Sequence, residues 1–160
     1  MTIAPRLRHQ LDELKVEYEL MEHGPTRSAM QNAQACQLPP GQIAKAVLLD
    51  TPRDHLLAVL PSDRRIALAE LRREVGGKPS LADESEVASI FDDCAIGAVP
   101  PLGHGYGIAT IVDDSLARQP DVYFEGGDHV SLVHVSGKDF ARMMRPALHG
   151  SFSERWEDIE

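Results

Sequence analysis

Lys45 is the first residue whose position suggests chemistry. It is the only charged side chain in the apolar run from Ile43 to Leu49. One interpretation is a lysine that buries its methylene groups and extends its ammonium group to solvent at a sheet edge. The other is a fixed cation in a cleft, where it would bind a phosphate or a polar ester. The spacing alone leaves both interpretations open.

A second candidate is the loop Gly97-Ala98-Val99-Pro100-Pro101. Glycine and proline together favour a rigid turn whose backbone N–H groups can point at a carbonyl oxygen or an oxyanion. The alternative is an ordinary connecting loop, because turns rich in glycine and proline are common.

Several other kinds of chemistry lack their sequence patterns. The seven histidines are scattered, without a His-Glu-x-x-His pair, and two cysteines, Cys36 and Cys94, cannot form a cysteine-rich metal site or a disulfide framework. No Gly-x-Ser-x-Gly elbow and no phosphate-binding Gly-Lys-Ser/Thr loop occurs. We therefore expect no metal, no cofactor and no acyl-serine intermediate.

Composition limits the partners. The chain has 160 residues, 42% of them hydrophobic, and a formal net charge of -9, which suits one globular domain. An acidic protein is a poor partner for duplex DNA or an anionic membrane, since both attract basic surfaces. No apolar run approaches the roughly 18 residues of a membrane span, and Met1 to Arg8 contains no secretory apolar region. The expected location is the cytoplasm.

Short helices and short strands must position the candidate residues. Helices are expected at 7–14, 29–36, 68–75, 83–90 and 138–144, and strands at 16–20, 43–49, 56–60, 108–112, 122–124 and 130–135. Thr26 or Ser28 would cap the second helix, and Asp83 with Glu86 predicts a capping box for the fourth. The helices are too few and irregular for a doubly wound sheet, so the pattern predicts a mixed α/β domain followed by an irregular tail.

Seven segments, taken in order, have the pattern of a known family. They are His23-Gly-Pro-Thr26, Ile43 to Leu49, Leu57 to Pro61, Leu81 to Glu84, Phe91 to Cys94, Gly97 to Gly103 and Val122 to His129. Each is weak alone, but their number, order and spacing are specific. From roughly residue 6 to 146, the chain resembles the YbaK/prolyl-tRNA synthetase-associated editing domain family, the free-standing aminoacyl-tRNA deacylases.

The resemblance implies a fold and a domain organisation. The fold would be a compact mixed α/β (α+β) domain with a curved, mostly antiparallel sheet flanked by short helices. Residues 1–150 would form the editing domain, and residues 151–160 an acidic C-terminal tail with four acidic residues against Arg155.

The resemblance also implies roles for individual residues. Lys45 occupies the position of the family's functional lysine, and Gly97 with Pro101 matches the Gly-x-x-x-Pro loop whose backbone amides approach the aminoacyl ester. His129 matches a pocket histidine found in some branches. Leu102 departs from the pattern, since many members have phenylalanine there.

Three further residues complete the expected site. The amide of Ala98 would join that of Gly97 in stabilising the oxyanion, while Met30 and Val47 would form pocket walls because they lie near the motifs.

The implied activity is trans-editing, the hydrolysis of the ester between a mischarged small amino acid and tRNA, with tRNA for proline as the first candidate. A hydroxyl group of the tRNA would help to activate water. Alanine, cysteine, serine and proline remain open as the amino acid. The alternative is a non-catalytic module that binds a nucleotide, an amino-acid derivative or a partner protein.

The net charge of -9 restricts how tRNA could bind. Local basic clusters occur at Arg64-Arg65 and at Arg72-Arg73 near Lys78, although these could simply be solvated faces. We therefore expect weak, transient contact with the acceptor end of aminoacyl-tRNA, with help from an aminoacyl-tRNA synthetase as a further expectation.

Overall fold

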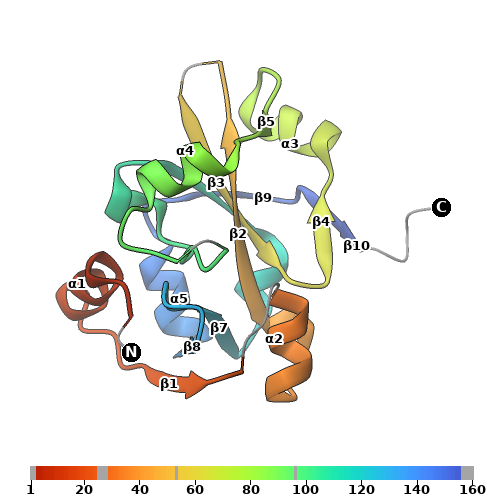
Figure 1. Cartoon of the computed structure of the whole chain (residues 1–160). Helices are drawn as coiled ribbons and strands as arrows, with labels where there is room; N and C mark the ends of the chain where they lie inside the picture. The colour runs from red at the N-terminus through yellow and green to blue at the C-terminus, as the bar shows by residue number, and fades with distance from the viewer. Residues whose placement is uncertain (1–2, 25–28, 53, 96, 156–160) are drawn as a thin grey trace.

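Figure 1 shows the computed structural model of the chain, which describes residues 3–24, 29–52, 54–95 and 97–155. The helices are α1 (Pro5–Glu13), α2 (Ala29–Cys36), α3 (Leu68–Val75), α4 (Glu84–Ile90) and α5 (Gly137–Met143), with 3-10 turns η1 (Pro40–Gln42), η2 (Gly103–Tyr106) and η3 (Asp114–Arg118). The strands are β1 (Glu19–Glu22), β2 (Ile43–Asp50), β3 (His55–Pro61), β4 (Arg64–Ile66), β5 (Ser80–Leu81), β6 (Ala109–Asp113), β7 (Asp121–Glu125), β8 (Ser131–Ser136), β9 (Leu148–Gly150) and β10 (Ser153–Arg155).

Eight strands form one mixed sheet in the order β1-β8-β7-β2-β3-β6-β9, with β5 paired to β2. Among the described residues, four pairings are antiparallel and three are parallel. Helices flank this sheet, which confirms the mixed α/β domain expected from the sequence. No described helix is both long and apolar enough to cross a membrane.

The central strand β2 has a partly open edge. β7 pairs with it at Ile43 and Ala44, and β5 pairs with it at Leu49 and Asp50. Between these pairings, no described strand lies beside residues 45–47 on that edge. Figure 1 shows α4 passing near one end of β2 and α2 near the other. The sheet therefore leaves an opening at the middle of its central strand.

The hydrophobic core lies on both faces of the sheet. The larger cluster buries Leu7 and Leu11 of α1 against Phe124 of β7 and Phe140 of α5. The smaller cluster packs α3 and the C-terminal segment against β2 and β3, with Phe152 fully buried. Because side chains alternate between the two faces of a strand, β2 contributes to both clusters.

The first strand differs from its prediction. The alternation of Val16, Tyr18 and Leu20 predicts a half-buried strand, but β1 begins at Glu19 and Leu20 is 49% exposed. Val16 is buried in the connection from α1, where Lys15 has a φ of 54°. β1 is an edge strand paired with β8, so its apolar residues need not face the core. The two predicted cap residues of α2, Thr26 and Ser28, lie outside the described residues.

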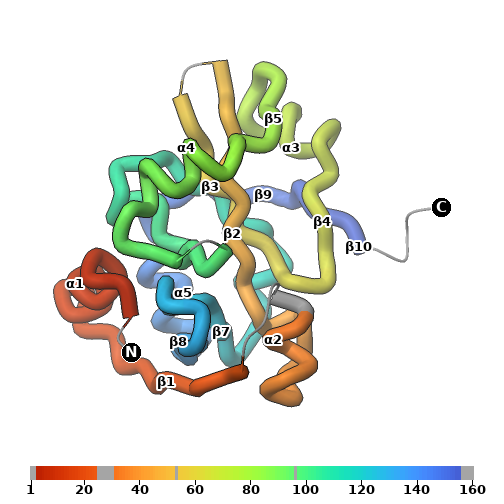
Figure 2. The backbone as a smooth tube through the Cα atoms, viewed as in Figure 1, coloured from red at the N-terminus to blue at the C-terminus, as the bar shows by residue number. Residues whose placement is uncertain are grey.

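The expectation of an irregular tail after α5 is wrong. β9 extends the main sheet beside β6, and β10 pairs with β4 in a two-stranded sheet (Figure 2). Phe152, between these strands, is fully buried. Strands of three residues are too short to show periodicity, so no local pattern predicts them. The packed chain extends beyond residue 150, to Arg155.

Candidate functional site

A pocket of about 320 Å³ lies at the open edge of β2. Its walls come from β2, from α4 and the loop after it, and from the end of β7. Most lining side chains are apolar, including Leu48, Val87 and Phe91, while Lys45 and Glu125 are charged. The volume is at the small end of the range for small-molecule sites, which fits a compact ligand group.

Lys45 lies in the wall of this pocket. It is half-buried in β2, opposite Leu60 of β3. Burial lowers the pKa of its ammonium group, and the carboxylate of Asp63 partly offsets this effect. The side chain thus has the surroundings of a cation held in a cleft, the second of the two interpretations of its position.

Gly97 and His129 lie side by side. Gly97 lines the pocket with a φ of 81°, and a Cβ atom added there would lie 3.3 Å from Nε2 of His129. Any side chain at residue 97 would therefore combine backbone strain with a tight contact. His129 itself has a φ of 66°. The structure brings together these two residues, which are distant in sequence.

The turn before His129 is held by side-chain and backbone contacts. The carboxylate of Asp128 accepts hydrogen bonds from the backbone N–H groups of Val130, at 3.1 Å, and Ser131, at 2.8 Å. The N–H of Ala95 donates to the carbonyl of Gly127 at 2.7 Å. This last bond joins the loop that carries Gly97 to the turn that carries His129, so it helps to keep the two segments together.

Ala98 and Pro101 are buried residues of the loop that carries Gly97. Neither of them lines the pocket. The N–H of Ala98 donates to the carbonyl of Ala95 at 3.1 Å, so this amide is engaged within the loop. A direct role of Ala98 in stabilising an oxyanion, as expected from the sequence, would require this hydrogen bond to open. Leu102 is fully buried in the larger core cluster, where it packs rather than contacting a ligand.

The two predicted wall residues have different outcomes. Val47 lies in β2 and lines the pocket. Met30 lies in α2, but its side chain is outside the part of the chain that the structure describes.

Glu125 is a pocket residue that the sequence did not single out. Its Oε1 accepts a hydrogen bond of 2.5 Å from Nδ2 of Asn32 in α2, and lies 3.6 Å from Nε2 of His23. Burial raises the pKa of its carboxyl group, while Asn32, His23 and His129 act in the opposite direction. Asn32 lies 93 residues from Glu125 in the sequence and His23 lies farther still, so only the fold assembles these groups. The one available signal was its place directly before the Gly126-Gly127 turn.

Cys94 also lines the pocket, but its thiol has low reactivity. Burial raises the pKa of its thiol to about 12, although a hydrogen bond with Tyr106 acts in the opposite direction. Since the thiolate is the nucleophilic form of cysteine, this thiol is a weak nucleophile at neutral pH.

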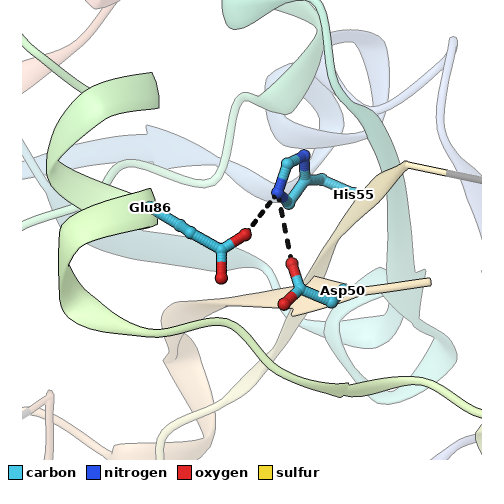
Figure 3. Close-up of side chains that lie close together, drawn as sticks. All are labelled: Asp50, His55 and Glu86. Carbon is cyan, nitrogen blue, oxygen red and sulfur yellow. Dashed lines mark hydrogen bonds and ion pairs between the residues drawn. The ribbon is translucent and has the colours of Figure 1, made fainter.

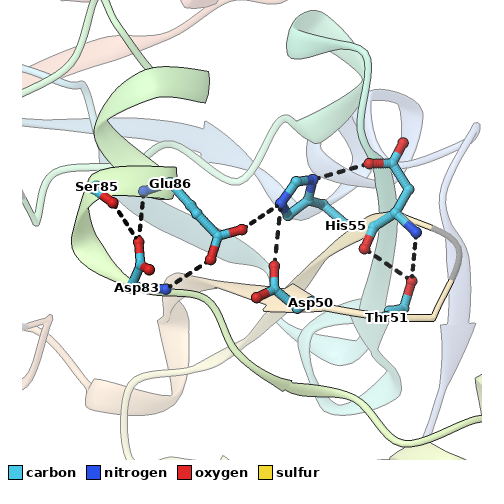
Figure 4. Close-up of polar contacts among 7 residues, drawn as sticks. Asp50, Thr51, His55, Asp83, Ser85 and Glu86 are labelled. Atoms are coloured by element: carbon cyan, nitrogen blue, oxygen red, sulfur yellow. Dashed lines mark hydrogen bonds and ion pairs between the residues drawn. The ribbon is translucent and has the colours of Figure 1, made fainter.

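A cluster outside the pocket lining fixes α4 in place. Nε2 of His55 lies 2.9 Å from Oε2 of Glu86 and 3.2 Å from Oδ1 of Asp50 (Figure 3). The ligand atoms of these three residues lie within 4.8 Å of one another, so they are the types of group that could hold a metal ion. Figure 4 shows the same Glu86 in a capping box with Asp83, which confirms the predicted start of α4. The cluster ties this pocket wall to the β2–β3 hairpin.

The predicted basic clusters are partly neutralised. Arg64 donates to Ser153 of β10 at 2.6 Å, and Arg65 forms an ion pair with Glu154 at 2.8 Å. Arg73 pairs with Glu70 within α3. The two ion pairs reduce the positive charge that the clusters could offer to a polyanion, whereas neutral Ser153 leaves the charge of Arg64 unchanged.

Comparisons with known proteins agree with this fold. The family model for the aminoacyl-tRNA editing domain matches residues 23–143. The multifunctional Ser/Thr-tRNA deacylase ProXp-y of Escherichia coli (strain K12) is 30% identical over 114 residues, 68% of each chain. The prolyl-tRNA editing protein ProX of Acetoanaerobium sticklandii is 27% identical over 143 residues, 85% of this chain and 87% of that protein.

A solved structure gives the same result. The crystal structure of a candidate trans-editing enzyme for prolyl tRNA synthetase superposes with a TM-score of 0.81 at 27% identity, and covers 94% of this chain and 96% of the other. Sequence, fold and pocket thus agree, and the chain belongs to the aminoacyl-tRNA editing domain family.

Proposed function

We propose that this protein is a trans-editing deacylase that hydrolyses the ester between a mischarged small amino acid and tRNA. The observation that carries the proposal is the convergence of Lys45 and Gly97 on one pocket at the open edge of β2. The names of the relatives, which include a Ser/Thr-tRNA deacylase and a prolyl-tRNA editing protein, support the same class of reaction.

The mechanism requires stabilisation of charge rather than a protein nucleophile. Water attacks the ester carbonyl, and the backbone N–H of Gly97 stabilises the oxyanion that develops. The C–O bond to the ribose then breaks, releasing the amino acid and leaving the terminal hydroxyl group of the tRNA. The neighbouring tRNA hydroxyl orients the water. This assistance by the substrate is consistent with a pocket whose thiol, Cys94, stays protonated and is therefore a weak nucleophile.

Lys45 binds the substrate in this scheme. Its ammonium group attracts the phosphate or hydroxyl groups of the terminal adenosine and holds the ester against Gly97. Because the rest of the chain is acidic, this contact is local, and aminoacyl-tRNA binds weakly through its acceptor end. An aminoacyl-tRNA synthetase would add affinity by delivering the tRNA.

The small pocket selects by size. A hydrophobic site separates amino acids that differ by one methylene by only about 1–3 kcal/mol, so synthetases charge some tRNA wrongly and a second site must correct it. A volume of about 320 Å³ lined by Val47, Leu48 and Phe91 favours small aminoacyl groups. We propose alanine, cysteine, serine or proline as the amino acid and tRNA for proline as the carrier.

A panel of mischarged tRNAs tests the activity. We expect turnover of at least one small aminoacyl ester, and loss of nearly all of it in Lys45→Ala. Lys138→Ala, which removes an exposed lysine of α5 that does not line the pocket, is the matched control. Circular dichroism must show that both variants are folded. Saturable binding of tRNA without turnover of any ester would instead identify a non-catalytic binding module.

The proposal also predicts the effect of a chelator. Excess EDTA should leave the deacylation rate unchanged, because the scheme routes no step through a metal. Loss of activity that added zinc or manganese restores would refute this scheme and would direct attention to Asp50, His55 and Glu86.

A further inference from the structure

Glu125 lines the pocket, and one of its two carboxylate oxygen atoms has no evident use. The side chain is only 12% exposed, and its Oε1 is engaged by Asn32 and by His23. Its Oε2 is buried and has no hydrogen-bond partner among the residues that the structure describes. A buried carboxylate oxygen without a partner is costly, so this arrangement favours a ligand that donates to it.

The position of Glu125 relates it to the reacting groups. β7 pairs with β2 in parallel, with Ile43 opposite Tyr123 and Ala44 opposite Phe124. Lys45 and Glu125 are therefore the next residues along the two strands, where the pairing ends and the pocket begins. One end of the pocket thus carries a cation and an anion on adjacent strands.

His129 connects Glu125 with the loop. Its imidazole lies beside Gly97 and is close enough to Glu125 to lower the pKa of that carboxyl group. The candidate oxyanion donor and the carboxylate thus line one pocket, with His129 beside the first and electrostatically coupled to the second. In an aminoacyl ester, the carbonyl carbon and the α-amino nitrogen are attached to the same carbon atom, so one pocket can receive both groups of the substrate.

We propose that Glu125 binds the α-ammonium group of the aminoacyl ester and makes the site selective for amino acids with a free amine. This inference rests on the proposed function, since it takes an aminoacyl ester of tRNA as the ligand. An ammonium group supplies the proton donor that Oε2 lacks and the positive charge that a buried carboxylate needs. Burial raises the pKa of this carboxyl group, and a bound cation would act against that shift.

The proposal assigns separate tasks to the charged groups. Lys45 holds the nucleotide end of the substrate, Gly97 receives the carbonyl oxygen, and Glu125 fixes the amino end. Asn32 and His23 engage Oε1, so Oε2 is the oxygen atom left for the ligand. Three fixed points orient the ester, and a peptidyl or N-acylaminoacyl ester would lack the third, because the α-nitrogen of its esterified residue is an uncharged amide.

Two stable adenosine analogues test this assignment by isothermal titration calorimetry. One carries an alanyl group in amide linkage at the 3′ position, and the other carries isobutyryl, in which a methyl group replaces the ammonium group. Neither is an ester, so affinity is measurable whether or not the protein deacylates. A charge-assisted hydrogen bond predicts that the wild type binds the alanyl analogue about 10- to 100-fold more tightly.

Glu125→Gln should abolish this preference while leaving the affinity for the isobutyryl analogue unchanged. Glu22→Gln, which removes the same charge from an exposed position on β1, controls for the change in net charge. Circular dichroism checks that both variants are folded.

Three results would overturn the proposal. The first is that the wild type binds the two analogues with equal affinity, and the second is that the preference for the alanyl analogue persists in Glu125→Gln. The third is that Glu125→Gln loses affinity for both analogues equally, which would show that Glu125 acts through Lys45. If the wild type fails to bind the alanyl analogue at millimolar concentration, this also overturns the proposal, because no preference for the ammonium group is then present. Ammonium-dependent binding in a protein that hydrolyses none of the mischarged tRNAs would refute the proposed function but support this assignment.

Discussion

Gly97→Ala separates the geometry of the loop from the stability of the fold. An alanine at a φ of 81° is in the left-handed region, which costs roughly 1–2 kcal/mol. Its Cβ would also lie 3.3 Å from Nε2 of His129, so the imidazole or the loop must shift by a few tenths of an ångström. We expect the free energy of unfolding to fall by about 1–2 kcal/mol, and the melting temperature by roughly 2–8 °C.

Gly107→Ala provides a matched control. Gly107 has a φ of 74°, but an added Cβ would have nothing within 4 Å, and the residue does not line the pocket. Both variants should therefore lose similar stability in urea unfolding. Deacylation of the best mischarged tRNA should fall about 10-fold or more in Gly97→Ala alone, because small displacements of groups that orient a substrate have large effects on rate.

The outcome of this pair decides the role of the loop. Wild-type activity in Gly97→Ala would refute the view that its backbone contacts the reacting ester. Equal loss of activity in both variants would attribute the effect to stability rather than to the geometry of the site.

Three other predictions concern the rest of the chain. Phe152→Ala should reduce the free energy of unfolding by about 3–5 kcal/mol in urea titrations, since the ring is fully buried; a change below about 1 kcal/mol would contradict a packed C-terminal segment. The hydrogen bond with Glu86 raises the pKa of His55 in the folded protein. The contribution of this bond to the free energy of unfolding should therefore be complete below about pH 6.5, the ordinary pKa of histidine, and should decrease as the pH rises through the pKa of His55 in the folded state. The destabilisation caused by His55→Gln, measured by denaturation at about pH 6 and about pH 9, should be smaller at the higher pH, and a constant difference would contradict this linkage. The affinity for tRNA should decrease only slightly as the salt concentration rises, since only a few phosphate groups are contacted. A steep dependence of the binding constant on salt concentration would indicate a basic surface that the described residues do not show.

The sequence predicted the architecture where its patterns were long or specific. The apolar runs around Lys45 and Leu57, the α3 segment and the capping box at Asp83 all correspond to elements of the structure. Short or exposed elements were less predictable. β1 has a sequence that alternates but lies at the edge of the sheet, and β9 and β10 are three residues each, so long-range pairing rather than local pattern determines them.

The pocket shows a similar division. Lys45, Val47 and Gly97 belong to motifs that could be recognised along the chain, and all three line the pocket. Which loop amide is engaged within the turn, as that of Ala98 is, depends on backbone conformation that the sequence does not show. Glu125 was missed because its partners come from α2 and from the segment before it.

The net charge of -9 is consistent with tRNA as a substrate, because the surroundings of individual charged groups matter more than their sum. Arg65 is paired with Glu154, one of the acidic residues assigned to the tail, so this carboxylate neutralises a positive charge within the packed fold. Lys45, in contrast, lies in a pocket wall where burial reduces the screening of its charge by solvent. A single half-buried cation can orient a terminal nucleotide without the extended basic surface that binds a whole tRNA. Recognition would then depend on the aminoacyl end, where Glu125 offers an anion to the one positively charged group of the substrate.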